Sequence, residues 1–158
     1  MSRYFKVVSN EHRHNEGYIK LPTRATEHSA AYDFYSPVDA VIQPQESVMI
    51  WTDIKAHMYY DNVLLINVRS SMGKHPVMIA NTQAIIDSDY YNNPGNDGNI
   101  GIRLFNLGKT PYEIKVGDRI AQGMFVKYGT VENDNTKTKR LGGFGSTNKQ
   151  EVQTNEKH

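Results

Sequence analysis

The chain has 158 residues, 38% of them hydrophobic and 22% charged, which predicts one soluble globular domain with a core of its own. With a formal net charge of +1, the chain does not carry the excess of basic residues expected of a protein that binds long nucleic acids. The absence of cysteine excludes disulfide and thiolate chemistry. No run approaches the roughly 20 apolar residues of a membrane span, and we expect no signal peptide. The composition therefore predicts a cytoplasmic protein whose partners include neither polymeric nucleic acid nor a membrane.

Short strand-like runs separated by turn signals follow one another through residues 1–127. The runs are 4–8, 32–36, 38–43, 47–51, 53–58, 63–68, 77–80, 83–86, 100–105, 112–116 and 119–127. The run 63–68 is apolar except for Asn67, as expected of a strand buried on both faces. No window has helical periodicity, and only one short helical turn is expected, after Arg69. Many short strands at regular spacing predict an all-β core, an antiparallel barrel or jelly roll, over residues 1–127.

The character of the chain changes after residue 127. Residues 128–141 carry few large apolar side chains and cannot nucleate a core. We expect residues 128–148 to form a flexible arm with a glycine-rich motif that closes over a nucleotide, and residues 149–158 to be a disordered tail. The alternative is a disordered tail that merely contains a glycine patch.

The segment 139–148, KRLGGFGSTN, combines groups suited to both ends of a nucleotide. Glycines expose backbone N–H groups and let an anion approach closely. Arg140 offers a planar charged fork that suits phosphate, and Ser146 and Thr147 add hydroxyl donors. Phe144 can stack on a base. The segment therefore predicts a flap that covers a bound nucleotide.

A second informative stretch, QAIIDSDYYNNPGNDGNIGIRLFN, reads as a strand, a loop and a strand. The loop 92–99 holds one proline, two glycines and four asparagines, which is typical of a hairpin tip with special backbone angles. Its backbone groups could read the edge of a base, and Tyr90 could pack on a sugar. Asp87, between an apolar pair and the turn, could be partly desolvated and act as a general base. The alternative is that Asp87 and Asp89 only cap the turn.

Three further segments are weak signals when each is taken alone. In NVRSSMGKH, Arg69, Ser70 and Ser71 follow a strand end and could form a nest for phosphate oxygens. In GDRIAQ, the amide of Gln122 could bind an oxyanion. In AYDFYS, Asp33 lies among aromatic residues, where a structural hydrogen-bonding role competes with holding the water shell of Mg²⁺.

Together, the segments AAYDFYS, RSSMG, IIDSDY, GDRIAQ and GGFGST resemble the trimeric dUTPase family in order and spacing, over residues 19–148. The NNPGNDG insertion resembles members from Gram-positive bacteria and their phages, which for a phage-encoded chain implies the host cytoplasm. Ala31 and Ala84 stand where the family usually has glycine.

The resemblance implies a dUTPase-like β-barrel or jelly roll of the β-clip type, assembled as a homotrimer with exchanged C-terminal arms. It implies that three chains share each site: the first, second and fourth motifs come from one chain, the hairpin from a second and the arm from a third. The implied reaction is Mg²⁺-dependent hydrolysis of dUTP to dUMP and pyrophosphate.

The resemblance also implies a role for each candidate residue. Asp87 would be the general base for a water that attacks the α-phosphorus. Tyr90 would pack on deoxyribose and exclude ribose, Asn81 would help to hold uracil, and Asp33 would orient the hydration shell of Mg²⁺. The other substrate-binding residues would be Arg69, Ser70, Ser71 and Gln122 on the phosphates, Phe144 over uracil, and Arg140, Gly145, Ser146 and Thr147 in the arm, with the γ-phosphate bound by Arg140 and the two hydroxyls.

Two alternatives remain at this point. Enzymes of the related dCTP deaminase class use a glutamate on the strand after the hairpin, where this chain has Arg103, which cannot shuttle a proton at neutral pH. A nucleotide-sensing regulatory protein without catalysis is the other alternative. The six histidines show no spacing typical of zinc ligands.

Overall fold

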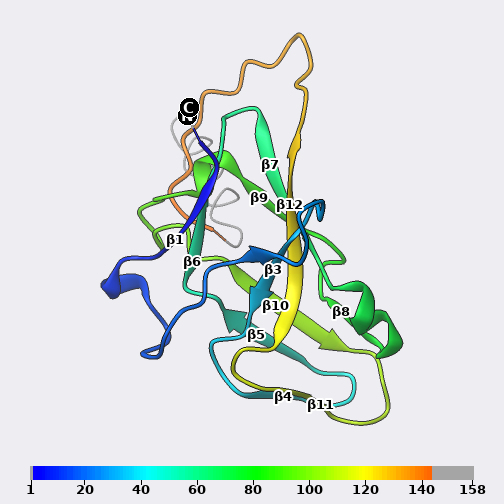
Figure 1. Ribbon diagram of the computed structural model, residues 1–158. Helices are drawn as coiled ribbons and strands as arrows, with labels where there is room; N and C mark the ends of the chain where they lie inside the picture. The colour runs from blue at the N-terminus through cyan, green and yellow to red at the C-terminus, as the bar shows by residue number, and fades with distance from the viewer. Residues whose placement is uncertain (1, 144–158) are drawn as a thin grey trace, which may run out of the picture.

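The computed structural model describes residues 2–143, and within them the chain is almost entirely β-structure (Figure 1). The strands are β1 (Tyr4–Val7), β2 (Thr23–Arg24), β3 (Tyr32–Tyr35), β4 (Ala40–Ile42), β5 (Ser47–Trp51), β6 (Ile54–His57), β7 (Asn62–Asn67), β8 (Val77–Ile79), β9 (Ala84–Asp87), β10 (Gly101–Asn106), β11 (Tyr112–Ile114) and β12 (Arg119–Lys127). Three short 3₁₀ turns, η1 (Asn10–His12), η2 (Ser70–Lys74) and η3 (Ser88–Tyr90), complete the regular elements. None of the helical segments in this part of the chain is long and apolar enough to cross a membrane.

The predicted all-β core is confirmed, and each predicted strand is present with its ends shifted by at most two residues. The helical turn expected after Arg69 is also present as η2. Sequence reasoning missed β2, η1 and η3 because elements of two or three residues are too short to show a period.

The strands form one large and one smaller antiparallel sheet, with two further strand pairs, β1 with β6 and β11 with β4. The large sheet has the order β2-β3-β12-β7-β9, and the smaller one the order β5-β10-β8. Figure 1 shows β12 as the long strand that runs through the middle of the molecule. Side chains from both sheets meet in one core, with fully buried members such as Phe34, Leu64, Ile66, Ile102 and Leu104.

The expectation that residues 63–68 are buried on both faces is only partly correct. Leu64 and Ile66 point into the core and are fully buried, but Leu65 and Asn67 are only half-buried. The reason is the alternation of a strand: β7 lies inside the sheet between β12 and β9, yet its other side chains face the outer surface of that sheet.

The predicted hairpin between residues 83 and 106 is wrong as a hydrogen-bonded ladder. β9 pairs with β7 at the edge of the large sheet, whereas β10 pairs with β5 and β8 in the small one. The loop between them does have the special backbone angles that its composition predicted, with positive φ at Asn92, Asp97 and Gly98. Because β9 and β10 belong to different sheets, they diverge and leave space between them.

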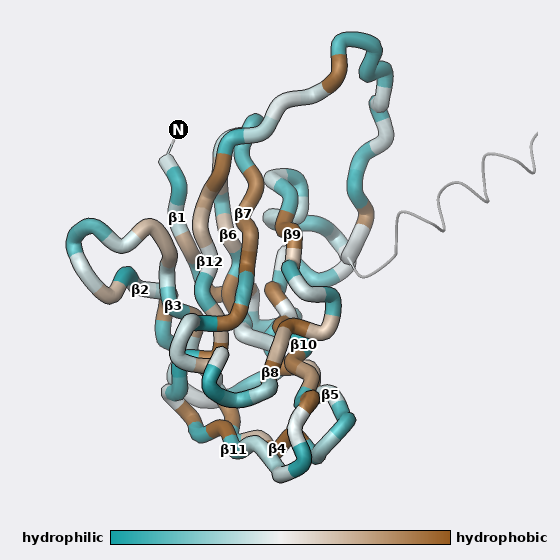
Figure 2. The backbone as a smooth tube through the Cα atoms, turned by 90° about the vertical axis from the view of Figure 1, so that its right-hand side faces the viewer, coloured by the Kyte–Doolittle hydropathy of each residue, from teal (hydrophilic) through white to brown (hydrophobic). Residues whose placement is uncertain are grey.

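Residues 128–143 contain no regular secondary structure. They leave the end of β12, rise above the sheets and return to the loop that precedes β10 (Figures 1 and 2). Figure 2 shows that most of this segment is hydrophilic, in contrast to the hydrophobic strands β7 and β12. The returning end contacts the loop closely: an added Cβ at Gly95 would lie 3.0 Å from the Cα of Gly142.

Candidate active site

A cavity of about 320 Å³ lies where β9 and β10 diverge. Its wall includes Ala84, Asp87, Tyr90, Gly101 and Arg103. We call this cavity the slot. A volume of this size suits a small ligand, and the diverging strand edges can offer backbone hydrogen-bonding groups to it. The exposed Asn81 also lines the slot, so the structure brings Asn81, Asp87 and Tyr90 together.

Asp87 ends β9 and directly precedes η3. Its side chain makes no capping hydrogen bond to that turn, which does not support the alternative that it only caps the turn. Burial raises the pKa of the Asp87 carboxyl; the Arg140 guanidinium opposes this shift and the Asp89 carboxylate adds to it, and the pKa stays above its usual value. A half-exposed carboxylate with a raised pKa is well suited to accept a proton from water.

The returning end of the 128–143 segment lies over the slot of its own chain. The Arg140 guanidinium pairs with both acids, with Nη2 on Asp87 and Nε 2.7 Å from Oδ1 of Asp89, and it sits 5.8 Å from the centre of the Tyr90 ring. An added Cβ at Gly143 would lie 2.7 Å from the Tyr90 ring, so only glycine permits this approach. In the single chain, Arg140 is therefore placed beside the acids rather than beside the other residues expected to bind phosphate.

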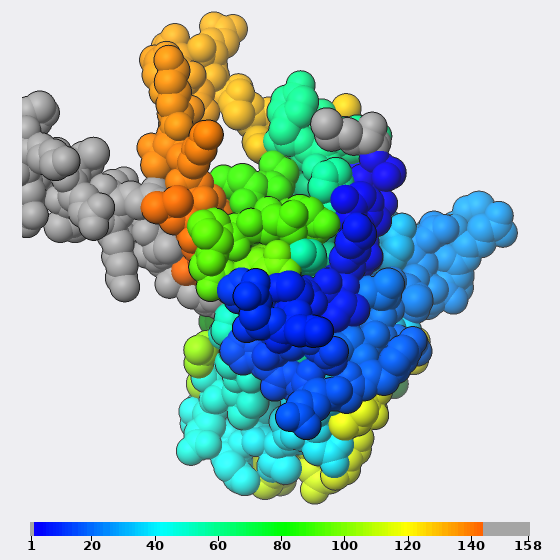
Figure 3. Space-filling view, turned by 90° about the vertical axis from the view of Figure 1, so that its left-hand side faces the viewer, coloured from blue at the N-terminus to red at the C-terminus, as the bar shows by residue number. Residues whose placement is uncertain are grey.

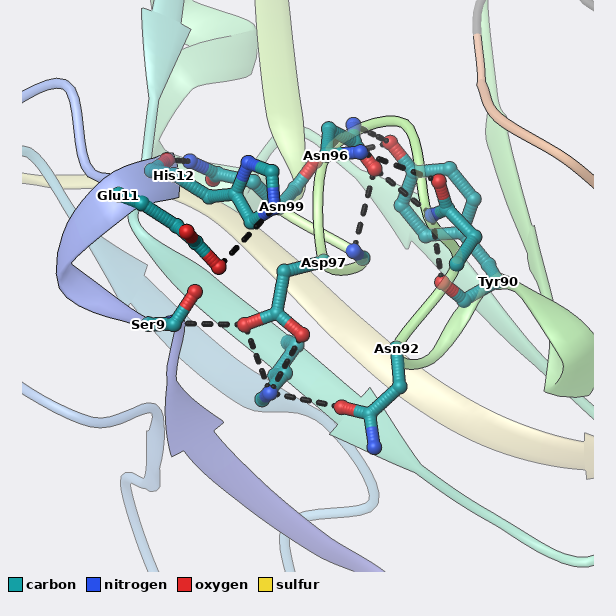
Figure 4. Close-up of polar contacts among 11 residues, drawn as sticks. Ser9, Glu11, His12, Tyr90, Asn92, Asn96, Asp97 and Asn99 are labelled. Carbon is teal, nitrogen blue, oxygen red and sulfur yellow. Dashed lines mark hydrogen bonds and ion pairs between the residues drawn. The ribbon is translucent and has the colours of Figure 1, made fainter.

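Tyr90 is the most buried of the candidate side chains around the slot, with 7% of its surface exposed. Its hydroxyl donates to the carbonyl of Asn99 at 2.8 Å and accepts from the amide of Asn96 at 2.6 Å (Figure 4). Sequence reasoning did not single out Asn96 or Asn99; the only signal was the asparagine-rich composition of the loop. Figure 3 shows the loop, in green, between the N-terminal segment, in blue, and the arm, in orange.

A second polar cluster forms where β7 runs into η2. Arg69 Nε lies 2.8 Å from Oδ1 of Asp33, and Arg119 Nη1 lies 3.3 Å from Oδ2 of the same carboxylate. Arg69 also donates to the hydroxyl of Ser71 at 3.3 Å. Arg69, Ser71 and Arg119 line a second cavity of about 310 Å³. Sequence reasoning missed Arg119, although it lies in the GDRIAQ segment, because only the amide of Gln122 was considered.

Two of the remaining candidates flank this cluster. Ser70 is exposed at the start of η2. Gln122 lies opposite Asn67 in the pairing of β12 with β7 and opposite Asp33 in the pairing of β12 with β3, and its side chain donates to the carbonyl of Val68 at 3.4 Å. The structure thus brings together the four residues expected to bind phosphate in the body of the chain, which are Arg69, Ser70, Ser71 and Gln122. Asp33 lies beside them.

Asp33 is poorly suited to coordinate a metal ion directly. Its carboxylate is buried and each oxygen already faces a guanidinium, and within residues 2–143 no group of three or more His, Asp or Glu residues could hold a metal ion. Each oxygen still has a lone pair that can accept a hydrogen bond from water. The donor set therefore fits the outer hydration shell of a cation carried by a ligand, not a site that binds the cation by itself.

Asp87, in the slot, and Arg69, in the second polar cluster, lie far apart in one chain. Asp87 pairs with Val63, near one end of β7, whereas Arg69 lies beyond the other end, six residues further along. At about 3.3 Å per residue, this separates them by roughly 20 Å. The two cavities share no lining residue. Phe144, Gly145, Ser146 and Thr147, the other candidates in the arm, lie outside the described residues.

An all-β fold, a slot with a half-exposed carboxylate in its wall and a separate cluster of arginine and serine side chains suited to bind anions are features that a nucleotide hydrolase needs. The family model dUTPase matches residues 17–148. This chain belongs to the dUTPase family. The resemblance that the five motifs predicted from the sequence is thereby confirmed, and so is the class of enzyme, a hydrolase.

Named relatives and solved structures agree with this assignment. The chain is 36% identical to the deoxyuridine 5'-triphosphate nucleotidohydrolase of Lactococcus lactis over 148 residues, which cover 92% of this chain and 97% of the relative. It is 37% identical to that of Fowlpox virus over 139 residues, with 81% and 89% covered.

Among solved structures, the dUTPase from Streptococcus mutans is 29% identical and superposes with a TM-score of 0.73 over 82% of this chain and 98% of that one. A mutant dUTPase from phage phi11 of S. aureus, described with a structural Mg(II) ion, is 22% identical and has a TM-score of 0.67 over 87% of this chain and 98% of that one. The phage protein shares the fold.

Proposed function

We propose that this chain hydrolyses dUTP to dUMP and pyrophosphate, with Mg²⁺, in a site assembled from a homotrimer. The observation that carries the proposal is the placement of Asp87, a carboxylate with a raised pKa, at the mouth of a slot whose wall contains Tyr90. Membership of the dUTPase family supports dUTP as the substrate.

In the proposed mechanism, Asp87 takes a proton from a water that attacks the α-phosphorus. A general base acts best when its pKa lies near the working pH, and burial moves the pKa of Asp87 in that direction. The backbone of the diverging strands β9 and β10 binds the edge of uracil, helped by Asn81, and leaves no room for the methyl group of thymine. Tyr90 packs on deoxyribose, and its nearly complete burial gives the rigid wall that steric exclusion of a 2′-hydroxyl needs.

The triphosphate is bound by cationic and hydroxyl groups. Arg69, Ser70, Ser71 and Gln122 are proposed to hold its oxygens. Arg119 is a fifth group because it lines the same cavity as Arg69 and Ser71. Mg²⁺, when bound, neutralises charge that develops on the phosphates. Substrate oxygens would hold the ion, and Asp33 would accept hydrogen bonds from its water shell.

The arm completes the site. Phe144 is proposed to stack on uracil, and Arg140, Gly145, Ser146 and Thr147 to bind the far end of the triphosphate. Closure of such a segment excludes bulk water and positions the attacking water. In the single chain Arg140 lies against its own Asp87, so exchange of arms between chains requires that this contact open or be remade with a neighbour.

The distance between Asp87 and Arg69 supports a site that is shared between chains, and membership of the family supports the trimer. Asp87 and Arg69 of one chain are too far apart to act on one α-phosphate, so a complete site needs Asp87 from one chain and Arg69 from another. The outer surface of the large sheet also carries an apolar row, Met124, Leu65 and Ile85, in which Ile85 is 61% exposed. We propose that a second copy of the chain covers this row.

The decisive experiment measures pyrophosphate release from dUTP, dTTP and dCTP, with ammonia release from dCTP as the test for deamination. We expect turnover of dUTP alone, and Asp87→Asn is expected to bind dUTP and lose turnover by at least about a hundredfold. Asp134→Asn, an exposed acid on the 128–143 segment, is the control and should match the wild type. Ammonia release would assign the deaminase class, and binding of dUTP without turnover would assign a nucleotide-sensing regulator.

A further inference from the structure

The hydroxyl of Tyr90 is held from both sides by the loop 92–99. It donates to the carbonyl oxygen of Asn99 at 2.8 Å and accepts a hydrogen bond from Asn96 Nδ2 at 2.6 Å. The amide of Asn96 also reaches the carbonyl of Asn99, at 3.3 Å. A phenol hydroxyl donates one hydrogen bond and can also accept one, so the hydroxyl of Tyr90 is satisfied in both roles. The two hydrogen bonds therefore fix the outer end of the tyrosine ring.

The main chain of Tyr90 is held by the same loop. Asn93 Nδ2 donates to the carbonyl of Tyr90 at 2.8 Å and to Oδ1 of Asn96 at 2.7 Å, so the two asparagine amides are joined. Gly98 N donates to Oδ1 of Asn96 at 3.1 Å. Gly98 has a positive φ, and a Cβ added there would lie 2.7 Å from the Tyr90 carbonyl oxygen, so the backbone passes close to Tyr90. Figure 4 shows Asn96 facing the Tyr90 hydroxyl from across the loop.

The loop itself is fastened to the rest of the molecule. Both carboxylate oxygens of Asp97 lie 2.8 Å from Lys55 Nζ on β6, and Ser9 N donates to Oδ2 of Asp97 at 2.7 Å. Asn99, fully buried, donates to Oδ1 of Asp53 at 2.8 Å and to the carbonyl of His12 at 3.0 Å. These anchors at Asp97 and Asn99, just after Asn96 in the chain, give Asn96 a fixed position from which to hold the tyrosine ring.

We infer that Asn96 is a positioning residue for sugar selection: its amide holds the Tyr90 ring at the wall of the slot, and thereby sets how strictly a 2′-hydroxyl is excluded. The inference rests on the proposed function. Asn96 acts through Tyr90 and is not assigned a contact with the substrate. A steric filter discriminates only as well as its wall resists displacement, so loosening the ring should admit a ribonucleotide.

The test compares kcat/KM for dUTP and UTP in Asn96→Ala. We expect the ratio of dUTP to UTP to fall about tenfold, with UTP turnover rising, because a lost hydrogen bond releases the ring. A general loss of stability would lower both values alike and leave the ratio unchanged. Asn135→Ala is the matched control and should keep the wild-type ratio, because Asn135 is exposed and its amide donates to the nearby carbonyl of Asn133.

A double-mutant cycle tests whether Asn96 acts through the hydroxyl of Tyr90. Tyr90→Phe keeps the ring and removes the hydroxyl, so Asn96→Ala should change the ratio no further in that background. An unchanged ratio in Asn96→Ala overturns the inference, as does an effect that adds fully to that of Tyr90→Phe. If Asn96→Ala does not fold, Tyr90→Phe alone decides, since its ratio must also fall. Failure of the wild type to hydrolyse dUTP would instead refute the proposed function.

Discussion

The carboxylate of Asp33 holds the guanidinium of Arg69, with Oδ1 2.8 Å from Nε. This ion pair connects β3 to the turn that follows β7, and Arg119 shares the second carboxylate oxygen at 3.3 Å. The carboxylate is 7% exposed, so both arginines are oriented by a group that water scarcely reaches. Asp33 thus organises the cationic cluster, and any contact it makes with the water shell of Mg²⁺ would be additional.

Replacing Asp33 by Asn should weaken both folding and phosphate binding. We expect the free energy of unfolding to fall by about 2 kcal/mol, because a buried charge-assisted hydrogen bond is lost and two arginines lose their partner. KM for dUTP should rise while the Mg²⁺ concentration that gives half-maximal activity changes little. Urea denaturation and a Mg²⁺ titration measure these effects, with the exposed Glu113→Gln as control. Rescue of activity by high Mg²⁺ would instead assign Asp33 chiefly to the cation.

The pH dependence of hydrolysis should report the carboxyl of Asp87. Its pKa lies above 3.8, chiefly through burial, and the base must be ionised, so kcat/KM should fall as the pH drops through that raised pKa. Asp89→Asn removes a neighbouring negative charge and should move this fall in kcat/KM, the acid limb of the pH profile, to lower pH. Arg140→Gln removes a stabilising cation and should move it to higher pH. An acid limb that neither substitution shifts would contradict Asp87 as the base.

Mixed trimers can test whether Asp87 and Arg69 of one site come from different chains. Neither Asp87→Asn nor Arg69→Ala should be active alone, but equal mixtures refolded together should regain activity in about a quarter of their sites, by random assembly. As a control, Asp87→Asn mixed with Tyr90→Ala should stay inactive, because both residues belong to the same slot. Lack of recovery in the first mixture would mean that one chain supplies both groups.

The arm should be needed for turnover but not for assembly. A chain that ends after Thr138 lacks Arg140 and the glycine-rich motif, while it keeps every strand. We expect kcat/KM for dUTP to fall by at least about a hundredfold, because water exclusion and arm contacts are lost. Its mass in solution should still correspond to three chains. Hydrolysis at the wild-type rate would refute the role proposed for the arm.

The Lys55–Asp97 pair should make stability sensitive to acid. Burial raises the pKa of Asp97, but hydrogen bonds from Lys55 and Ser9 outweigh this and leave the pKa below 3.8. The pair therefore stabilises the fold fully above the unfolded pKa and loses this contribution as the pH falls through the folded one. Asp97→Asn should cost about 1–2 kcal/mol at pH 7 and flatten the acid dependence of the melting temperature. An unchanged acid dependence in Asp97→Asn would contradict this.

Much of the chemistry could be predicted from residue order alone, because strand alternation and turn composition are local properties. The strands, the turn after Arg69 and the family all followed from segments such as RSSMG and IIDSDY. The roles proposed for Asp87 and Tyr90 came from these same local patterns, and the role of Asn81 came from the family resemblance; all three remain predictions until activity is measured.

The pairing of strands that are distant in the chain cannot be predicted from any local segment. This pairing determines the arrangement of the sheets and the contacts within the candidate site. Only the tertiary structure separates β9 from β10 into two sheets, couples Asp33 to Arg69 and Arg119, and places Asn96 on the Tyr90 hydroxyl. It also sets Asp87 and Arg69 at opposite ends of β7. The sequence by itself determined which groups this protein carries. The fold decided which of them meet, because side chains distant in the chain become neighbours only when the sheets and loops pack.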